Sequence, residues 1–287
     1  MDLIERLSTV RFTDPGAISS ALSRRIPGAP LGSEPLMIVA ADHPARGALA
    51  AGGDAHAMAS REEMLERCCI ALSRPGVNGF LGTPDMVEDL ALLGALDGKA
   101  VFGSMNRSGL SGSVFEVDDR MTAFDTTGIV DAGLVGGKLL LRLDPSDPAT
   151  SVTLERVAQA VNQLAAVQRV ALIEPFMSSL INGSMVNDLS PDAVMRSMAV
   201  ASGLGRTSAW TWLKVPCVPD MERVLKATTL PCLLLGGEVS DDLDQSVRHW
   251  AAALGIPNVK GLVIGRALLF PVGGDVAAAV DQLVEVL

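Results

Sequence analysis

Several features that mark other classes of protein are scarce or missing in this chain of 287 residues. Its four cysteines, at positions 68, 69, 217 and 232, form no CxxC pair, which favours free thiols in a reducing compartment. No apolar run approaches the ~20 residues that span a bilayer. The first residues, MDLIERLSTVRF, lack the basic start and apolar stretch of a secretion signal. The sequence therefore predicts a cytoplasmic protein with no membrane partner.

The chain also lacks basic runs, and its formal net charge is -10. Nucleic acids bind proteins through clustered Lys and Arg, so this charge argues against a nucleic-acid partner. Metal ligands are sparse too. Asp42, His43, Asp54 and His56 could offer nitrogen and oxygen atoms to a divalent ion, but only three histidines occur and this loop has no recognised ligand spacing. We predict no metal site and interpret His56 as an ordinary loop residue.

Short apolar runs alternate with longer amphipathic segments along almost the whole chain. Apolar runs buried on both faces are typical of parallel strands linked by helices. The predicted strands cover 35–42, 77–82, 99–105, 136–144, 169–176, 209–215, 231–237 and 259–270. The helices that follow them cover 60–74, 85–96, 117–133, 151–168, 190–205, 220–228, 241–255 and 275–287. Ser60 with Glu63 forms a capping box, and Ser190 before Pro191 is a second signal for the start of a helix.

Eight strand–helix units predict a closed (β/α)8 barrel, or TIM barrel. We expect residues 1–287 to form a single domain, in which residues 1–34 add one or two N-terminal helices. A doubly wound open sheet is the alternative. Such a sheet normally has a GxGxxG turn after its first strand, and residues 40–53, AADHPARGALAAGG, contain none.

Chemically active residue types gather at the ends of the predicted strands. These ends meet at one face of a barrel, where catalytic groups lie. The residues found there are Asp42, His43, Lys138, Asp144, Glu174, Lys214, Gly236, Gly237, Gly265 and Arg266.

Lys214 is the most unusual of these residues, because it stands in an apolar run, TWLKVP. The commoner role of such a lysine is structural, either exposed at the strand end or paired with a carboxylate such as Glu174. Trp212 and Pro216 flank it, so we expect its stem to be buried. Desolvation and a second nearby cation favour the neutral amine, which attacks carbonyl groups and forms Schiff bases. The other strand ends favour this nucleophilic role.

Glycines follow the last two predicted strands, at Gly236, Gly237 and Gly265. Barrels commonly bind a phosphate at this place through backbone N–H groups and a short helix. Arg266 could add a charge-assisted contact. Glycines that only turn tight corners are the alternative, but their occurrence on consecutive strands favours a phosphate site.

These segments resemble those of the class I, Schiff-base aldolases of the deoxyribose-phosphate, tagatose bisphosphate and archaeal-type fructose bisphosphate group. WLKVPCVPD (212–220) resembles the strand that carries their Schiff-base lysine, and ALIEPF (171–176) resembles the strand with their active-site glutamate. GGKLLLRLDPSDP (136–148) is similar to their strand with an inward lysine, and IVAADH (38–43) to their first strand. LLLGG (233–237) and VIGRALLF (263–270) are similar to their phosphate-binding strand ends.

The resemblance implies a class I aldolase that needs no cofactor. It implies Lys214 as the Schiff-base lysine and Glu174 as the acid or base. Lys138 would act on Lys214 and hold a substrate oxygen, and Asp42 would orient a lysine or assist dehydration of the carbinolamine. Because the chain has no tyrosine, the tyrosine acid of some fructose bisphosphate members has no counterpart here.

The implied substrate is a phosphorylated keto sugar or keto sugar acid, with dihydroxyacetone phosphate as one product. Arg107 and Arg142 are candidates to bind a carboxylate or a second phosphate at the far end. The substrates left open are 6-phospho-5-dehydro-2-deoxygluconate from inositol catabolism, tagatose or fructose bisphosphate, a sulfosugar phosphate and deoxyribose phosphate.

Two other classes of function stay open. A barrel isomerase or synthase would use the same phosphate site without an imine, and a non-catalytic barrel would only bind a sugar phosphate. Against the second stands the free-energy cost of burying two lysines and several carboxylates without a use. Barrels also commonly associate through their outer helices, so a homo-oligomer is left open.

Overall fold

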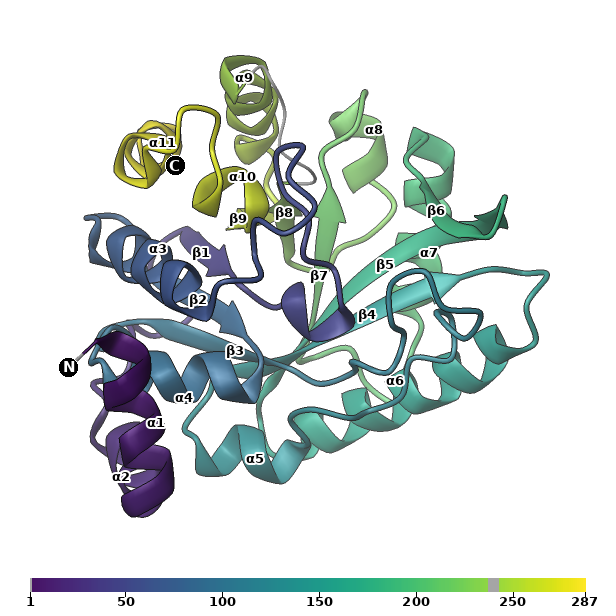
Figure 1. Cartoon of the computed structure of the whole chain (residues 1–287). Helices are drawn as coiled ribbons and strands as arrows, with labels where there is room; N and C mark the ends of the chain where they lie inside the picture. The colour runs from purple at the N-terminus through teal and green to yellow at the C-terminus, as the bar shows by residue number, and fades with distance from the viewer. Residues whose placement is uncertain (1, 237–242) are drawn as a thin grey trace.

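The computed structural model describes residues 2–236 and 243–287 and shows a closed barrel of strands surrounded by helices (Figure 1). Its strands are β1 (Leu36–Ala40), β2 (Gly79–Gly82), β3 (Ala100–Ser104), β4 (Gly136–Leu143), β5 (Val170–Ile181), β6 (Ser184–Asp188), β7 (Thr211–Pro216), β8 (Cys232–Leu235) and β9 (Val259–Ile264). Its helices are α1 (Leu3–Thr13), α2 (Gly16–Arg24), η1 (Pro44–Arg46), α3 (Arg61–Ser73), α4 (Pro84–Leu92), α5 (Thr126–Asp131), α6 (Ala149–Ala166), α7 (Pro191–Ser202), α8 (Met221–Leu225), α9 (Leu243–Leu254), α10 (Arg266–Leu269) and α11 (Val276–Val284).

The described strands close into a TIM barrel, as the sequence predicts. Their order in the sheet is β4-β3-β2-β1-β9-β8-β7-β5-β6, and β4 also pairs with β5, so the two sides of the sheet meet. All pairings are parallel except that of β5 with β6. The open-sheet alternative is therefore wrong, and β6 is an addition outside the ring.

The first 34 residues, for which one or two helices were expected, form two, which pack beside α4. Arg11 of α1 pairs with Glu88 and Asp89 of α4, each at 2.8 Å. Arg25, which follows α2, donates hydrogen bonds to the carbonyl oxygens of Lys99 and Gly133. These contacts hold the extension against the N-terminal ends of β3 and β4.

The segment between β3 and α5 differs from the prediction of a helix over 117–133. Only Thr126–Asp131 is helical, and it begins where the Asp125 side chain accepts a hydrogen bond from Gly128 N at 2.7 Å. Residues 105–125 form a long loop in which Glu116 and Asp119 are buried. Because these acidic side chains face arginines of the barrel and not solvent, the amphipathic pattern is misleading here.

The end of β5 also differs from the prediction, which stopped this strand at residue 176. The strand continues to Ile181 and turns back through Asn182 and Gly183 into β6. Both turn residues have positive φ, 52° and 79°, as the two-residue hairpin turn of an Asn-Gly pair requires. The last predicted strand, 259–270, is shorter than expected, since β9 ends at Ile264 and α10 follows.

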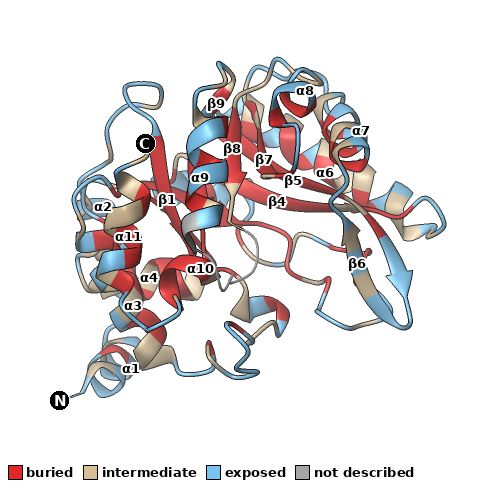
Figure 2. Ribbon diagram, turned by 90° about the horizontal axis from the view of Figure 1, so that it is seen from above, coloured by how far each residue is buried: buried red, intermediate tan, exposed pale blue. Residues whose placement is uncertain are grey.

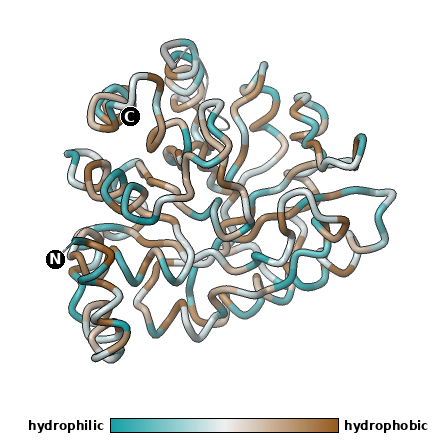
Figure 3. The backbone as a smooth tube through the Cα atoms, in the orientation of Figure 1, coloured by the Kyte–Doolittle hydropathy of each residue, from teal (hydrophilic) through white to brown (hydrophobic). Residues whose placement is uncertain are grey.

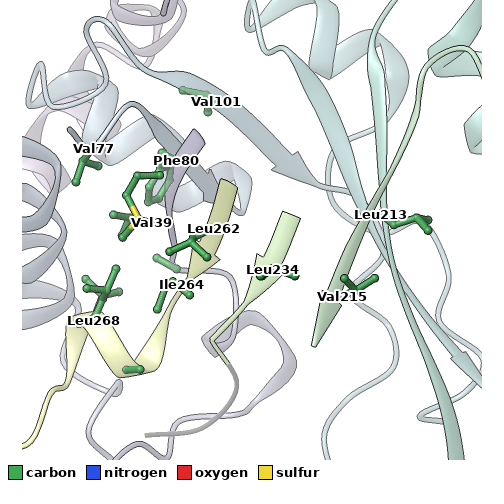
Figure 4. Packing of buried hydrophobic residues seen from close by; sticks show 14 of the residues in the cluster. Val39, Val77, Phe80, Val101, Leu213, Val215, Leu234, Leu262, Ile264 and Leu268 are labelled. Atoms are coloured by element: carbon green, nitrogen blue, oxygen red, sulfur yellow. The ribbon is translucent and has the colours of Figure 1, made fainter. Parts of the chain in front are cut away.

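Alternate residues of the barrel strands face two apolar cores, because side chains of a strand point to opposite faces. Leu262 and Ile264 of β9 point outward with Val39 of β1, where Leu268 of α10 also packs (Figure 4). The interior core is formed by Leu36, Ile38, Ala40, Leu81, Ala100, Phe102, Val170, Leu172, Leu233 and Val263. The strands of the ring are accordingly mostly buried, whereas the β5–β6 hairpin and the outer faces of the helices are exposed (Figure 2).

Hydrophobic residues concentrate on the strands and on the inner faces of the helices (Figure 3). No helix within residues 2–236 and 243–287 is both long enough and apolar enough to cross a membrane.

Gly261 offers a test of how closely β9 packs against β1. Its φ is 136°, and a Cβ atom there would overlap the backbone of Leu36. We expect Gly261→Ala to lower the free energy of unfolding by about 2–4 kcal/mol, because it adds a backbone clash to a strained φ. Gly94→Ala is the matched control: Gly94 also has positive φ, 71°, but no atom lies within 4 Å of the added Cβ. It should cost about 1 kcal/mol. Equal losses in urea denaturation would contradict this packing.

Candidate active site

A layer of polar side chains lies directly above the apolar interior of the barrel. Its members point inward at the period of two that a strand imposes. The members are Asp42, Ser104, Lys138, Glu174 and Lys214, with exposed fractions of 0–8%. They come from β3, β4, β5 and β7 and from the residues just after β1, and β4 and β5 continue beyond the layer toward the mouth of the barrel. The structure thus brings together the four catalytic residues that the sequence predicts.

The charged members of this layer form a chain of alternating sign. Lys138 Nζ lies 3.3 Å from Asp42 Oδ2 and also pairs with Glu174 Oε2. The other oxygen of Glu174 lies 2.9 Å from Lys214 Nζ. Buried ions are stable only when their desolvation is offset by close partners, and each ion here has one or two.

Both carboxylates of the layer are ionised. Burial alone would raise the pKa of Glu174, but Lys138 and Lys214 outweigh it and hold that pKa well below its usual range. Burial likewise opposes ionisation of Asp42, while Arg107 and Lys138 bring its pKa well below the usual value.

The pKa of Lys138 is lowered from its ordinary value toward neutral pH. Its pKa is about 8: burial lowers it, the negative charges of Asp42 and Glu174 offset only part of that effect, and the positive charges of Lys214 and Arg107 add to the lowering. Lys138 can therefore hold or release a proton at a pH where enzymes work.

The support of Asp42 was not predicted from the sequence. Ser104 Oγ donates a hydrogen bond to Asp42 Oδ2 at 2.7 Å. Arg107 donates through Nη1 to the Asp42 carbonyl oxygen at 2.8 Å, and its Nη2 pairs with the Asp42 carboxylate. The expectation that Arg107 binds a substrate anion is corrected here, because both its terminal nitrogens are engaged by Asp42. The alternation of Phe102, Ser104 and Asn106 was the available signal that β3 contributes to the layer.

Arg142, the other predicted anion-binding arginine, lies further along β4. Its Nη2 lies 2.8 Å from Glu116 Oε1 of the loop that follows β3. A second pair lies nearby, with Arg46 Nη2 2.5 Å from Asp119 Oδ2. These two pairs anchor the loop to the mouth of the barrel.

The predicted phosphate-binding residues occupy the ends of β8 and β9, and Gly237 lies outside the described residues. A Cβ at Gly236 would lie 2.8 Å from Ile264 Cγ2. At Gly265 it would lie 2.9 Å from the Ala40 carbonyl oxygen. Arg266 begins α10 directly after Gly265. A Cβ would thus overlap backbone at Gly265 and would have to displace the Ile264 side chain at Gly236, so packing explains both glycines, and phosphate binding there stays a prediction.

The remaining polar candidates lie at the edge of the layer or away from it. His43 Nδ1 is 3.8 Å from Asp42 Oδ1. Burial lowers the pKa of His43 to about 3, although the negative charge of Asp42 acts to raise it. Its imidazole is therefore neutral. Asp144 accepts two hydrogen bonds from Ser146 and so caps a turn.

Asp54 and His56 line a separate cavity of about 500 Å³ beside α3, to which no residue of the charged layer contributes. Within the part of the chain that the structure describes, no three His, Cys, Asp or Glu side chains lie together as metal ligands would.

The fold and the site define a TIM barrel that carries a buried layer of lysines and carboxylates. Aldolases are among the solved structures that share this fold. A Schiff-base-forming fructose-1,6-bisphosphate aldolase superposes with a TM-score of 0.64 at 16% identity, covering 93% of this chain and 98% of its own. An archaeal fructose-1,6-bisphosphate aldolase with its catalytic lysine bound to the carbinolamine intermediate gives 0.65 at 15% identity, covering 94% and 98%.

The chain belongs to the Cgl0159-like family, whose model matches residues 34–284. The crystal structure of Cgl0159 from Corynebacterium glutamicum is similar over 99% of this chain and 96% of its own, with 52% identity and a TM-score of 0.96. No curated protein matched the sequence.

The lowered pKa of Lys138 has a measurable consequence for stability. Between its folded value of about 8 and its ordinary value of 10.5, the unfolded chain holds a proton that the native chain has lost. The Lys138 contribution to the free energy of unfolding should therefore rise with pH across this window, by at most about 1.4 kcal/mol per unit, and stay constant below it. Lys138→Met should remove that rise, measured as the difference from wild type in urea denaturation at pH 8 and pH 10. Parallel pH dependence of the two proteins would contradict it.

Proposed function

We propose that this protein is a class I aldolase that forms a Schiff base through Lys214. The observation that carries this proposal is the environment of Lys214, an amine with 4% exposure at a strand end and 2.9 Å from an ionised carboxylate. Lys138 is held between two carboxylates, whereas the ion pairs of the described residues give Lys214 one. Lys214 is thus the amine with more freedom to attack a carbonyl.

In the proposed imine formation, Glu174 and Lys138 have different roles in proton transfer. Lys214 Nζ attacks the ketone carbon, and Glu174 accepts a proton from the attacking amine. The carbinolamine then loses its hydroxyl group as water after receiving a proton. Lys138, which also contacts Glu174 and titrates at about pH 8, can supply that proton. Asp42 keeps Lys138 in place.

Cleavage then uses the protonated imine as an electron sink. A base removes the proton from the hydroxyl group of the departing carbon, the C–C bond breaks, and its electrons form an enamine on Lys214 as an aldehyde leaves. The enamine takes up a proton, and water hydrolyses the resulting imine to release the ketone product. Glu174 is our candidate for the base.

The substrate that we propose is a phosphorylated keto sugar or keto sugar acid, with dihydroxyacetone phosphate as the ketone product. Gly236, Gly237, Gly265 and Arg266 would hold the phosphate. The inositol-derived 6-phospho-5-dehydro-2-deoxygluconate and the tagatose and fructose bisphosphates all fit this description. Imine chemistry by itself needs no cofactor. We further propose that the enzyme acts in the cytoplasm as a single domain per chain.

Borohydride reduction in the presence of dihydroxyacetone phosphate tests the imine. We expect a stable adduct on the peptide containing Lys214, in the wild type and in the exposed-lysine control Lys226→Met, and none in Lys214→Met. Mass spectrometry locates the adduct, and circular dichroism checks that each variant is folded. An adduct on Lys138, or no adduct with this ketone and a panel of sugar phosphates and aldehydes, would sink the proposal. A failed panel would favour the isomerase, synthase or binding alternatives.

Glu174 should control how fast that adduct forms. Glu174→Gln keeps the shape of the side chain but removes the charge that both lysines contact, and with it the proton acceptor. We expect the trapping rate to fall by about 10²-fold or more, the scale of general acid–base catalysis. Glu222→Gln, on the exposed surface of α8, is the control. A trapping rate within twofold of wild type would show that Glu174 has no part in proton transfer.

A further inference from the structure

Arg142 lies at the mouth of the barrel above the charged layer. Residues 138, 140 and 142 share the face of β4 that lines the interior, so Arg142 is two inward positions beyond Lys138. Burial lowers the pKa of Arg142, and Glu116 and Glu174 are among the charges that act on it. A substrate bound to Lys214 and reaching out of the barrel would therefore pass this guanidinium.

Two nitrogens of Arg142, Nε and Nη1, are buried without a hydrogen-bond partner. Arg46 and Arg107 also have a buried Nε without a partner, but both terminal nitrogens of each are engaged. A buried N–H that makes no hydrogen bond costs about 1–3 kcal/mol. Arg142 thus differs from these two neighbours, because it has a terminal N–H group that can donate a hydrogen bond to a ligand oxygen.

The charges around Arg142 are balanced. Arg142 and Arg46 face Glu116 and Asp119, two cations against two anions. Each acid is held by a backbone N–H at 2.9 Å, from Gly112 and Gly109 respectively. Because both arginines are already paired with an acid, a phosphate dianion at this place would find no unpaired cation among these four residues. A carboxylate has half that charge, and one of its oxygens can accept a charge-assisted hydrogen bond from Nη1, the terminal nitrogen that Glu116 does not engage.

We propose that Arg142 and Glu116 select a substrate whose end remote from the phosphate bears a carboxylate in place of a second phosphate. This inference rests on the proposed aldolase function and narrows its substrate class to a keto sugar acid with one phosphate group. Its aldehyde product then carries the carboxylate. Arg142 donates to that carboxylate, while Glu116 orients the guanidinium and repels a dianion.

The test is the addition of dihydroxyacetone phosphate to three aldehydes: succinic semialdehyde, which has a carboxylate, glyceraldehyde 3-phosphate and uncharged glyceraldehyde. We expect the wild-type kcat/KM for the carboxylated aldehyde to exceed the other two by about tenfold or more, the scale of one charge-assisted contact. Arg142→Met should lose that preference because its KM for the carboxylated aldehyde is raised. Glu116→Gln should raise the relative kcat/KM for glyceraldehyde 3-phosphate by about tenfold. Arg120→Met, which alters a mostly exposed arginine of the same loop, should keep the wild-type ranking.

Borohydride trapping with dihydroxyacetone phosphate alone involves no aldehyde. It therefore distinguishes a failure of the proposed aldolase function from a failure of carboxylate selection. If the wild type formed no adduct, the aldolase function itself would be wrong. If the adduct formed but the wild type preferred glyceraldehyde 3-phosphate, or used glyceraldehyde equally well, selection of a carboxylate would be wrong. It would also be wrong if Arg142→Met lowered kcat/KM equally for all three aldehydes or abolished the adduct.

Discussion

The two ion pairs of Glu174, with Lys138 and with Lys214, are the interaction on which the rest of the site depends. Two ammonium groups this deeply buried would each cost several kcal/mol of desolvation if they stood alone. Glu174 offers one oxygen to each, and Asp42 compensates Lys138 from its other side. Ser104 and Arg107 in turn stabilise the Asp42 carboxylate, through a hydrogen bond and an ion pair respectively. The site is therefore one network, in which loss of any member leaves a buried charge with one partner fewer.

The barrel makes this network possible through the period of its strands. Side chains at alternate positions fill the interior with apolar groups up to Ala40 and Leu172, and the next inward positions hold Asp42 and Glu174. The loop after β3 completes the mouth, because it supplies Arg107 to the layer and Glu116 to Arg142. One face of the barrel thus holds both the proposed Schiff-base lysine and an arginine that we propose binds an acidic group further out.

The sequence predicted those parts of the molecule that follow from local periodicity. The TIM barrel was predicted because its strands are apolar on both faces, and Asp42, Lys138, Glu174 and Lys214 were grouped because parallel strand ends converge. The structure of residues 105–125 was missed, since the partners of its buried acids, Arg46 and Arg142, come from distant segments. The β5–β6 hairpin was missed although its Asn-Gly turn was visible. Arg107 shows the same limit, because spacing alone does not reveal that Asp42 engages it.

The central claim is that Lys214 attacks a ketone within this network while Glu174 and Lys138 handle its protons. A crystal structure of the protein after borohydride reduction with dihydroxyacetone phosphate tests that claim most directly. We predict a covalent bond from Lys214 Nζ to the former ketone carbon, with Glu174 in contact with that nitrogen and the phosphate beside Gly236 and Gly265. A bond to Lys138, or a ketone phosphate bound away from this layer, would contradict it.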